Sequence, residues 1–151
     1  MKYAVIQNFV FSLWNELKIN QQIEFNNVNL LLKYGHLRGW LEDKEELHPF
    51  DILDKRTAAR IIHQFMKIEL KIPDEENIGK AKELKDLYTC KVCANHIAQV
   101  YVKGIMKSTK ITDFTTNQTV KIFDSLAQIS QKEQNIIIEN TKKQILLNKA
   151  E

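Results

Sequence analysis

Helix-breaking residues are rare in this chain, and their scarcity constrains the fold more than any other feature. Its 151 residues include only two prolines and four glycines. Strand-like alternation is scarce, whereas apolar residues recur at the three- and four-residue spacing of an amphipathic helix. Within residues 3–18, for example, Ile6, Val10 and Leu13 fall on one stripe. The pattern predicts a protein built from helices.

Capping patterns locate the remaining helix starts. Asp54 is placed to accept a backbone N–H at the start of a helix. Two capping boxes, Thr115-x-x-Gln118 and Ser130-x-x-Glu133, mark two further starts. The helices after the first are expected at about residues 28–34, 54–66, 86–104, 115–126 and 131–149. We therefore expect an all-α fold, a single-domain bundle of about six helices.

Length and charge are typical of a single globular domain. The chain of 151 residues suits one domain over 1–151, and 22 basic against 19 acidic residues leave a formal net charge of +3. Because it has no dense block of Lys and Arg, nucleic acid is not an expected partner. No membrane span is expected either, since the apolar runs are too short. The N-terminus lacks signal-peptide features, which predicts a cytoplasmic chain as written, or a cell-surface protein if an export signal precedes Met1.

An internal repeat organises the middle of the chain. The first unit reads "VNLLLKYGHLRGW" and then "LDKRTAARIIHQF", and the second reads "NHIAQVYVKGIMKS" and then "FTTNQTVKIFDSL". In each, an apolar helix ends at a glycine, Gly35 or Gly104, and a loop leads to a capped helix that begins at Asp54 or Thr115. Glycine suits this place because it readily adopts the left-handed conformation that ends a helix. The units cover about residues 25–69 and 84–128, with flanking helices at about 3–18 and 131–149.

These units resemble the S-layer homology domain, a repeated helical module of bacterial cell-surface proteins. "KDLYTCKVCANHIAQVYVKGIM" is similar to the first half of that module, and "YGHLRGW" is similar to its turn. The resemblance implies a non-enzymatic, cell-wall-related binding module with a ligand groove between repeats. The ligand would be anionic: a cell-wall-type saccharide, a small anion or an acidic protein surface.

The resemblance also implies which residues line the groove. Lys55 occupies the position of the motif's arginine, with Arg56 beside it, and Trp40 beside guanidinium groups is suited to stacking on a sugar. The alternative interpretation is that Trp40 covers the edge of the core and the cations form a solvated helix start. The predicted ligand-binding residues are Gly35, Arg38, Gly39, Trp40, Lys55, Arg56 and Arg60.

A second candidate site contains both cysteines, Cys90 and Cys93, with His96 following. Within the expected helix 86–104 the cysteines share the apolar face, which favours packing as small hydrophobic residues. A zinc site would need four ligands, and a redox C-x-x-C would be expected to open a helix. A zinc-binding or redox protein using these three residues is the alternative function. The binding module is expected to need no cofactor, and the alternative would use zinc.

Other patterns point to no catalytic chemistry. The sequence has no Ser-His-Asp order, Gly-rich phosphate loop or H-E-x-x-H, so we expect a non-enzyme. The acidic run at residues 42–46 is predicted to be a solvated loop. The Ile136–Ile138 run in the last helix is predicted to pack on the repeats or to form a homodimer face.

Overall fold

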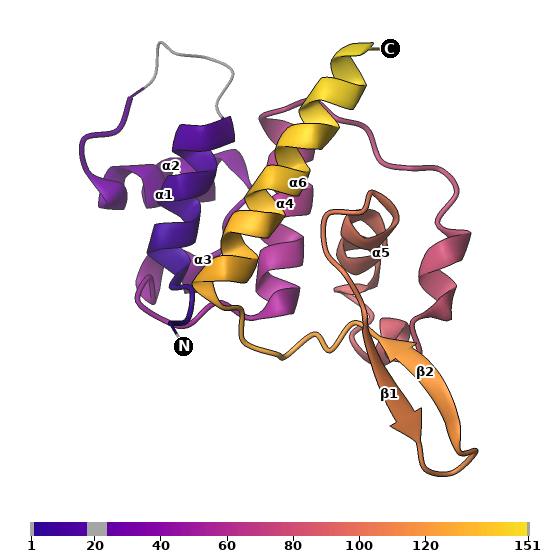
Figure 1. Ribbon diagram of the computed structural model, residues 1–151. Helices are drawn as coiled ribbons and strands as arrows, with labels where there is room; N and C mark the ends of the chain where they lie inside the picture. Colours follow the sequence, from indigo (N-terminus) through magenta and orange to yellow (C-terminus); the bar gives the residue numbers. More distant parts are fainter. Residues whose placement is uncertain (1, 18–23, 151) are drawn as a thin grey trace.

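The computed structural model describes residues 2–17 and 24–150. In this part of the chain there are six α-helices, two short 3₁₀ helices and one two-stranded sheet (Figure 1). The α-helices are α1 (Ile6–Leu17), α2 (Val28–Arg38), α3 (Asp43–Leu47), α4 (Lys55–Ile68), α5 (Ala94–Val102) and α6 (Gln131–Ala150). The 3₁₀ helices are η1 (Gly79–Glu83) and η2 (Leu87–Thr89), and the strands are β1 (Thr109–Asp113) and β2 (Gln118–Ile122).

Helices α1, α4 and α6 begin together, where three extended segments meet. The backbone N–H of Ala4 donates to the carbonyl of Ile129 at 2.8 Å, that of Leu53 to Ala4 at 2.9 Å, and that of Ile129 to Leu53 at 2.9 Å. These three hydrogen bonds close a ring, and all three side chains are buried. Each residue lies two positions before its helix. The ring therefore fixes the three helix starts next to one another.

Side-chain caps at two of these starts match the sequence prediction. The carboxylate of Asp54 accepts the backbone N–H of Thr57 at 2.8 Å and caps α4. At α6, the hydroxyl of Ser130 accepts the N–H of Glu133 at 3.1 Å, and the Glu133 carboxylate accepts the N–H of Ser130 at 3.3 Å. The second capping box is thus confirmed.

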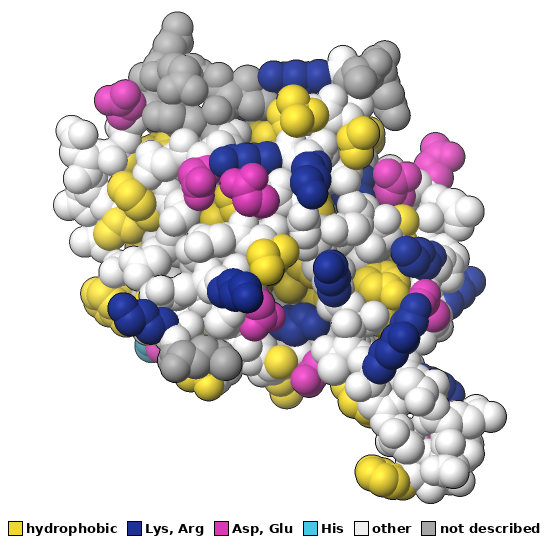
Figure 2. Space-filling view, viewed as in Figure 1, with side chains coloured by type: hydrophobic (Ala, Val, Ile, Leu, Met, Phe, Trp, Pro, Cys, Tyr) yellow, Lys and Arg dark blue, Asp and Glu magenta, His cyan; other side chains and the backbone are white. Residues whose placement is uncertain are grey.

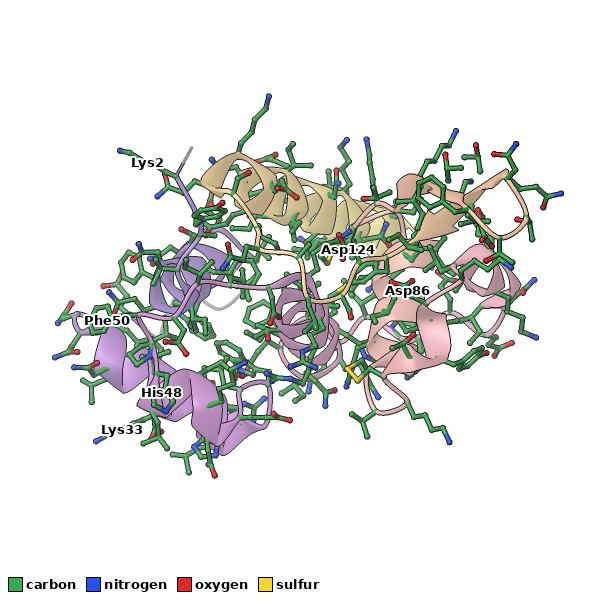
Figure 3. The ribbon with its side chains drawn as sticks, turned by 90° about the horizontal axis from the view of Figure 1, so that it is seen from below. Lys2, Lys33, His48, Phe50, Asp86 and Asp124 are labelled. Carbon is green, nitrogen blue, oxygen red and sulfur yellow. A yellow bond between two sulfur atoms is a disulfide. The ribbon has the colours of Figure 1, made fainter. Side chains whose placement is uncertain are left out.

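The first capping box is wrong, and with it the all-α fold class. Residues 109–122 form an antiparallel hairpin in which Ile111 pairs with Val120, so the protein is mixed rather than all-α. Both strands are rich in β-branched residues, which favour extended backbone. Asn117, in the turn, has the positive φ of 56° that asparagine tolerates. Beyond the hairpin, Asp86 accepts the backbone N–H groups of Phe123 and Asp124 at 2.8 Å each, and Figure 3 shows the two aspartates close together.

The helix expected over 86–104 is shorter than predicted. Its first part is η2, Cys90 is extended with φ −117° and ψ 100°, and α5 starts only at Ala94. The C-terminal limit agrees with the sequence, because Gly104 takes a φ of +75° just after α5. The C-x-x-C segment therefore opens a helix instead of lying inside one.

The structure also corrects two of the landmarks on which the repeat was based. Gly35 lies inside α2, and the left-handed glycine that ends α2 is Gly39, with φ +99°. The capped helix expected to begin at Thr115 is a hairpin, so the predicted match between that segment and α4 is wrong. The two repeat units themselves stay a prediction.

Helix α6 packs on α1 and buries Ile137 and Ile138, while Ile136 is 45% exposed (Figure 1). A homodimer through this helix stays a prediction. No helix in the described ranges is long and apolar enough to cross a membrane.

Candidate functional site

The predicted ligand-binding residues do not form one cluster; they lie in three separate places in the fold. Trp40 is fully buried, and its indole N–H donates to the carboxylate of Glu69 at 2.9 Å. Arg38 Nε donates to the same carboxylate oxygen at 2.9 Å. The Trp40 ring also meets Phe65 edge-on, with centroids 4.9 Å apart. Trp40 therefore presents no exposed face on which a sugar could stack.

The two glycines near Trp40 are explained by packing and backbone conformation. A Cβ on Gly35 would lie 2.6 Å from the Leu41 side chain and 3.0 Å from the Trp40 ring. Gly39 holds the left-handed conformation that ends α2. Both residues thus serve the turn that buries Trp40.

Lys55 points away from Arg56, toward the hairpin. Its ammonium donates to the carbonyl of Lys107 at 3.0 Å and to the carbonyl of Phe123, and it lies 4.4 Å from the centre of the Phe123 ring. Burial lowers the pKa of Lys55, while the charges of Asp124, Glu133 and Asp86 raise it in part. This cation holds the segment after α5 against the start of α4.

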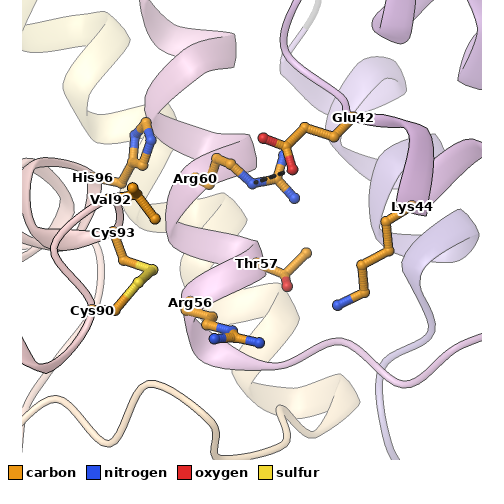
Figure 4. A pocket seen from close by; sticks show the side chains of 9 residues that line it. All are labelled: Glu42, Lys44, Arg56, Thr57, Arg60, Cys90, Val92, Cys93 and His96. Carbon is orange, nitrogen blue, oxygen red and sulfur yellow. Dashed lines mark ion pairs between the residues drawn. A yellow bond between two sulfur atoms is a disulfide. The ribbon is translucent and has the colours of Figure 1, made fainter.

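Arg56 and Arg60 line a cavity that brings the two predicted sites together. The cavity measures about 310 Å³ and lies between the start of α3, the first two turns of α4 and the cysteine loop (Figure 4). Its walls are formed by the side chains of Glu42, Lys44, Arg56, Thr57, Arg60, Cys90, Val92, Cys93 and His96. We call this the α3–α5 cavity. The sequence did not predict that the cations and the cysteines share one space.

The cations of the α3–α5 cavity differ in how far they are neutralised. Arg60 Nη2 lies 2.7 Å from Glu45, whose side chain is fully buried, and Arg60 Nε lies 3.7 Å from Glu42. Arg56 has only a contact of 3.9 Å with Asp54, the residue that caps α4. Lys44 forms no ion pair with any residue the structure describes. Arg60 is thus held in place, whereas Arg56 and Lys44 keep cationic groups free for a ligand.

On the opposite wall, Cys90 and Cys93 form a disulfide (Figures 3 and 4). As a disulfide the two sulfurs are not the thiolates that zinc requires. Among residues 2–17 and 24–150, no group of three or more His, Cys, Asp or Glu side chains is arranged to hold a metal ion. The packing interpretation is also incomplete, because both cysteines are only partly buried.

His96 belongs to a hydrogen-bonded chain that runs away from the cavity. Its Nδ1 lies 2.7 Å from Nδ1 of His63, and Nε2 of His63 lies 2.7 Å from the Asp74 carboxylate. Burial, together with the charges of His63, Arg60 and Lys67, lowers the pKa of His96 to about 4, although Asp74 opposes this. His96 is therefore a neutral side chain in the cavity wall near pH 7. His63 is the hydrogen-bond partner that orients its ring.

Several residues of the site were missed by sequence reasoning. Glu45 belongs to the acidic run predicted to be solvated, yet its side chain is fully buried against Arg60. His63 and Asp74 lie 33 and 22 residues before His96 (96 − 63 and 96 − 74), and no local spacing relates them. The one usable signal was the capping pattern Glu42-x-x-Glu45, which does form a capping box at α3.

Charges of both signs also occur elsewhere on the described surface. On the face shown in Figure 2, Lys and Arg side chains are scattered among acidic and apolar ones.

Comparison with protein-family models, curated proteins and solved structures finds no significant match. The S-layer homology resemblance therefore stays a prediction.

Proposed function

We propose that the protein is a non-catalytic binding module that holds an anionic group in the α3–α5 cavity. The observation that carries this proposal is the pair of cations, Arg56 and Lys44, that line the cavity without a close acidic partner. Arg56 extends from α4 and Lys44 from α3, so an anion between them would join two elements. The guanidinium of Arg56 can meet a carboxylate with two parallel hydrogen bonds.

The backbone N–H groups at the start of α4 are not available to bind an anion. The N–H groups of Lys55 and Arg56 donate to the carbonyls of Ala127 and Ser125 at 2.9 and 2.8 Å, and that of Thr57 donates to Asp54. All three N–H groups are therefore occupied. An anion in the cavity depends on Arg56 and Lys44 and not on the helix terminus.

The proposed ligand is a carboxylate-bearing saccharide of the cell-wall type. A cavity of about 310 Å³ lies at the lower end of the range for small-molecule sites and has room for a sugar residue. Val92 and the disulfide form an apolar wall opposite the cations, suited to the face of a sugar ring. The resemblance to S-layer homology repeats supports the same class of ligand.

Titration calorimetry with trigalacturonate, a carboxylate-bearing trisaccharide, tests the proposal against the neutral trisaccharide maltotriose. We expect trigalacturonate alone to bind, with affinity that falls as salt is raised. Arg56→Ala is expected to weaken binding by about tenfold or more, because a charged hydrogen bond is worth about 1.5–3 kcal/mol. Lys44→Ala is expected to weaken binding less.

Lys33→Ala is the matched control, since Lys33 is an exposed lysine on α2 away from the cavity. It should leave the affinity unchanged. Equal binding of both trisaccharides, or full binding by the Arg56→Ala, Lys44→Ala double variant, would refute the site. Arg60 is unsuitable for this test because its loss would leave Glu45 buried without its partner.

A further inference from the structure

The Cys90–Cys93 disulfide lies at a helix start that lacks a side-chain cap. Cys93 is the N-cap residue of α5 and makes no capping hydrogen bond, whereas Asn27 and Asp54 cap α2 and α4 with their side chains. The Cys93 backbone is already helical, with φ −88° and ψ −19°, and the N–H groups of Cys93 and Ala94 donate to the carbonyls of Cys90 and Lys91. A thiolate at Cys93 would therefore be stabilised by the positive end of the α5 dipole.

The disulfide is also open to an attacking molecule. Both cysteines are partly exposed and both line the α3–α5 cavity. Val92, between them, is 86% exposed, so the loop that carries the disulfide stands out toward solvent. A structural disulfide inside a core would offer no such approach.

Positive charge lines the same cavity as the sulfurs. Arg56 and Arg60 extend from α4, and in Figure 4 their guanidinium groups turn toward Glu42 and Lys44, away from the disulfide. Arg60 is paired with Glu45, so the charge available to a new thiolate is chiefly that of Arg56. Nearby cations and a helix N-terminus both stabilise reactive thiolates.

From this geometry we infer that Cys90–Cys93 is a thiol–disulfide exchange centre that accepts two electrons from a dithiol. The thiolate of an external dithiol attacks Sγ of Cys90, and the bond between the two protein sulfurs breaks. Cys93 leaves as a thiolate at the start of α5, where it is stabilised. The leaving sulfur with the lower proton affinity departs faster, which selects Cys93 for this role.

The second step completes the exchange. The other thiol of the dithiol loses its proton and attacks its own sulfur bound to Cys90, which closes a disulfide in the external molecule and releases Cys90. Two electrons have passed to the protein sulfurs. Of the two protons lost by the dithiol, Cys90 takes up one, and the other goes to solvent while Cys93 stays a thiolate. The inference does not depend on anion binding.

Equilibration of the folded protein with mixtures of reduced and oxidised dithiothreitol tests the exchange. We expect two thiols per chain to appear without loss of the circular-dichroism signal of the native fold. The two single variants Cys90→Ser and Cys93→Ser then separate the sulfurs, with thiolate followed by absorbance at 240 nm. Cys93 should titrate well below the usual thiol pKa of about 8.5, and Cys90 should titrate closer to it.

Arg56→Ala in the Cys90→Ser background should raise the pKa of the Cys93 thiol, and Lys33→Ala should not move it. Two outcomes would overturn the inference. One is a disulfide that dithiothreitol reduces only when the protein unfolds, and the other is a Cys93 pKa no lower than that of Cys90. If trigalacturonate fails to bind while the thiol results hold, the binding proposal alone fails.

Discussion

Two helix starts meet at the α3–α5 cavity, and they are built in opposite ways. At the start of α4, Asp54 caps the helix and the first N–H groups all have partners. At the start of α5, Cys93 occupies the N-cap without a capping bond and its sulfur is tied to Cys90. One start is capped by a side chain, whereas the other has no side-chain cap and follows a turn in which the N–H groups of Cys93 and Ala94 donate to the carbonyls of Cys90 and Lys91.

The two sides of the cavity are therefore expected to respond differently to substitution. The α4 side is fixed by the ring of Ala4, Leu53 and Ile129 and can present Arg56 from a rigid position. The α5 side follows η2 and an extended residue, so its environment depends on the state of one covalent bond. Substitutions at Arg60 and Asp54 on the α4 side should therefore act on stability, and those at Cys90 and Cys93 should depend on redox state.

The largest expected effect is on the α4 side, at Arg60. Arg60→Ala removes the partner of Glu45, whose side chain is fully buried. Breaking a buried ion pair from one side costs about 3–5 kcal/mol, because a charge is left without compensation. We expect a loss of that size in the free energy of unfolding, measured by urea denaturation.

A second variant separates charge from packing at this position. Glu45→Gln in the Arg60→Ala background removes the stranded charge while its carbonyl oxygen can still accept the N–H of Glu42. It should recover part of the loss. Arg56→Ala is the matched arginine control and should cost less than about 0.5 kcal/mol. If Arg56→Ala lowers the free energy of unfolding as much as Arg60→Ala does, the two arginines do not differ in how they are paired.

On the α5 side, the comparison predicts that serine is a better residue than alanine at position 93. Without the disulfide, residue 93 can leave its helical backbone conformation (φ −88°, ψ −19°) for the extended one of an N-cap, and in the Cys90→Ser background Cys93→Ser then supplies a capping hydroxyl that Cys93→Ala cannot supply. The serine variant should be more stable by about 1 kcal/mol. Both should be less stable than the oxidised protein, because a disulfide closing so short a loop contributes about 2 kcal/mol. Equal stability of the two variants would show that α5 needs no cap.

Sequence reasoning succeeded where the deciding interactions are local. The caps at Asp54 and Ser130 and the glycine after α5 follow from residues within one turn of each helix end. It failed at Thr115, where a capping-box pattern lies in the turn of a hairpin. The β-branched residues on either side of Thr115 favour strands, but the helical spacing of the apolar residues predicts a helix there.

The candidate site was harder to predict because distant segments build it. Arg56 and Arg60 were identified, and so were Cys90, Cys93 and His96, but as two separate sites. Their meeting depends on how α4 packs on α5, which no spacing in the sequence encodes. The residues around Trp40 in the sequence suit a stacking platform and a buried ring equally well, and only the packing shows the ring buried and hydrogen-bonded to Glu69.

A smaller effect is expected at the cap of α4. Asp54→Ala removes the acceptor for the N–H of Thr57 and should cost about 1 kcal/mol of unfolding free energy. Asp51→Ala, at an exposed aspartate of the preceding loop, is the control and should cost less than about 0.5 kcal/mol. If Asp54→Ala costs no more than the control, the completeness of the α4 start does not depend on its cap.

The smallest effect is a dependence on pH that arises at the cavity wall. His96 faces His63, Arg60 and Lys67 on α4 and Asp74 beyond it, and its pKa is about 4 in the folded chain. An unfolded histidine titrates near 6.5, so between about pH 6.5 and 4 the unfolded state binds more protons. Stability should therefore fall as pH is lowered through this window. Because His96 is partly exposed, we expect a total of no more than about 1 kcal/mol.

Urea denaturation at several pH values in this window measures the dependence, with His96→Gln and the exposed His48→Gln as a matched pair. His96→Gln should flatten the dependence, and His48→Gln should leave it unchanged. Asp74 adds a separate loss at lower pH: burial raises its pKa, but the hydrogen bond and charge of His63, with Lys67, lower it below the usual value overall. Its contribution is present above about pH 3.9 and disappears as the carboxylate is protonated below that. A slope at pH 5–6 that survives His96→Gln would place the titrating group elsewhere and leave the cavity wall without a role in acid sensitivity.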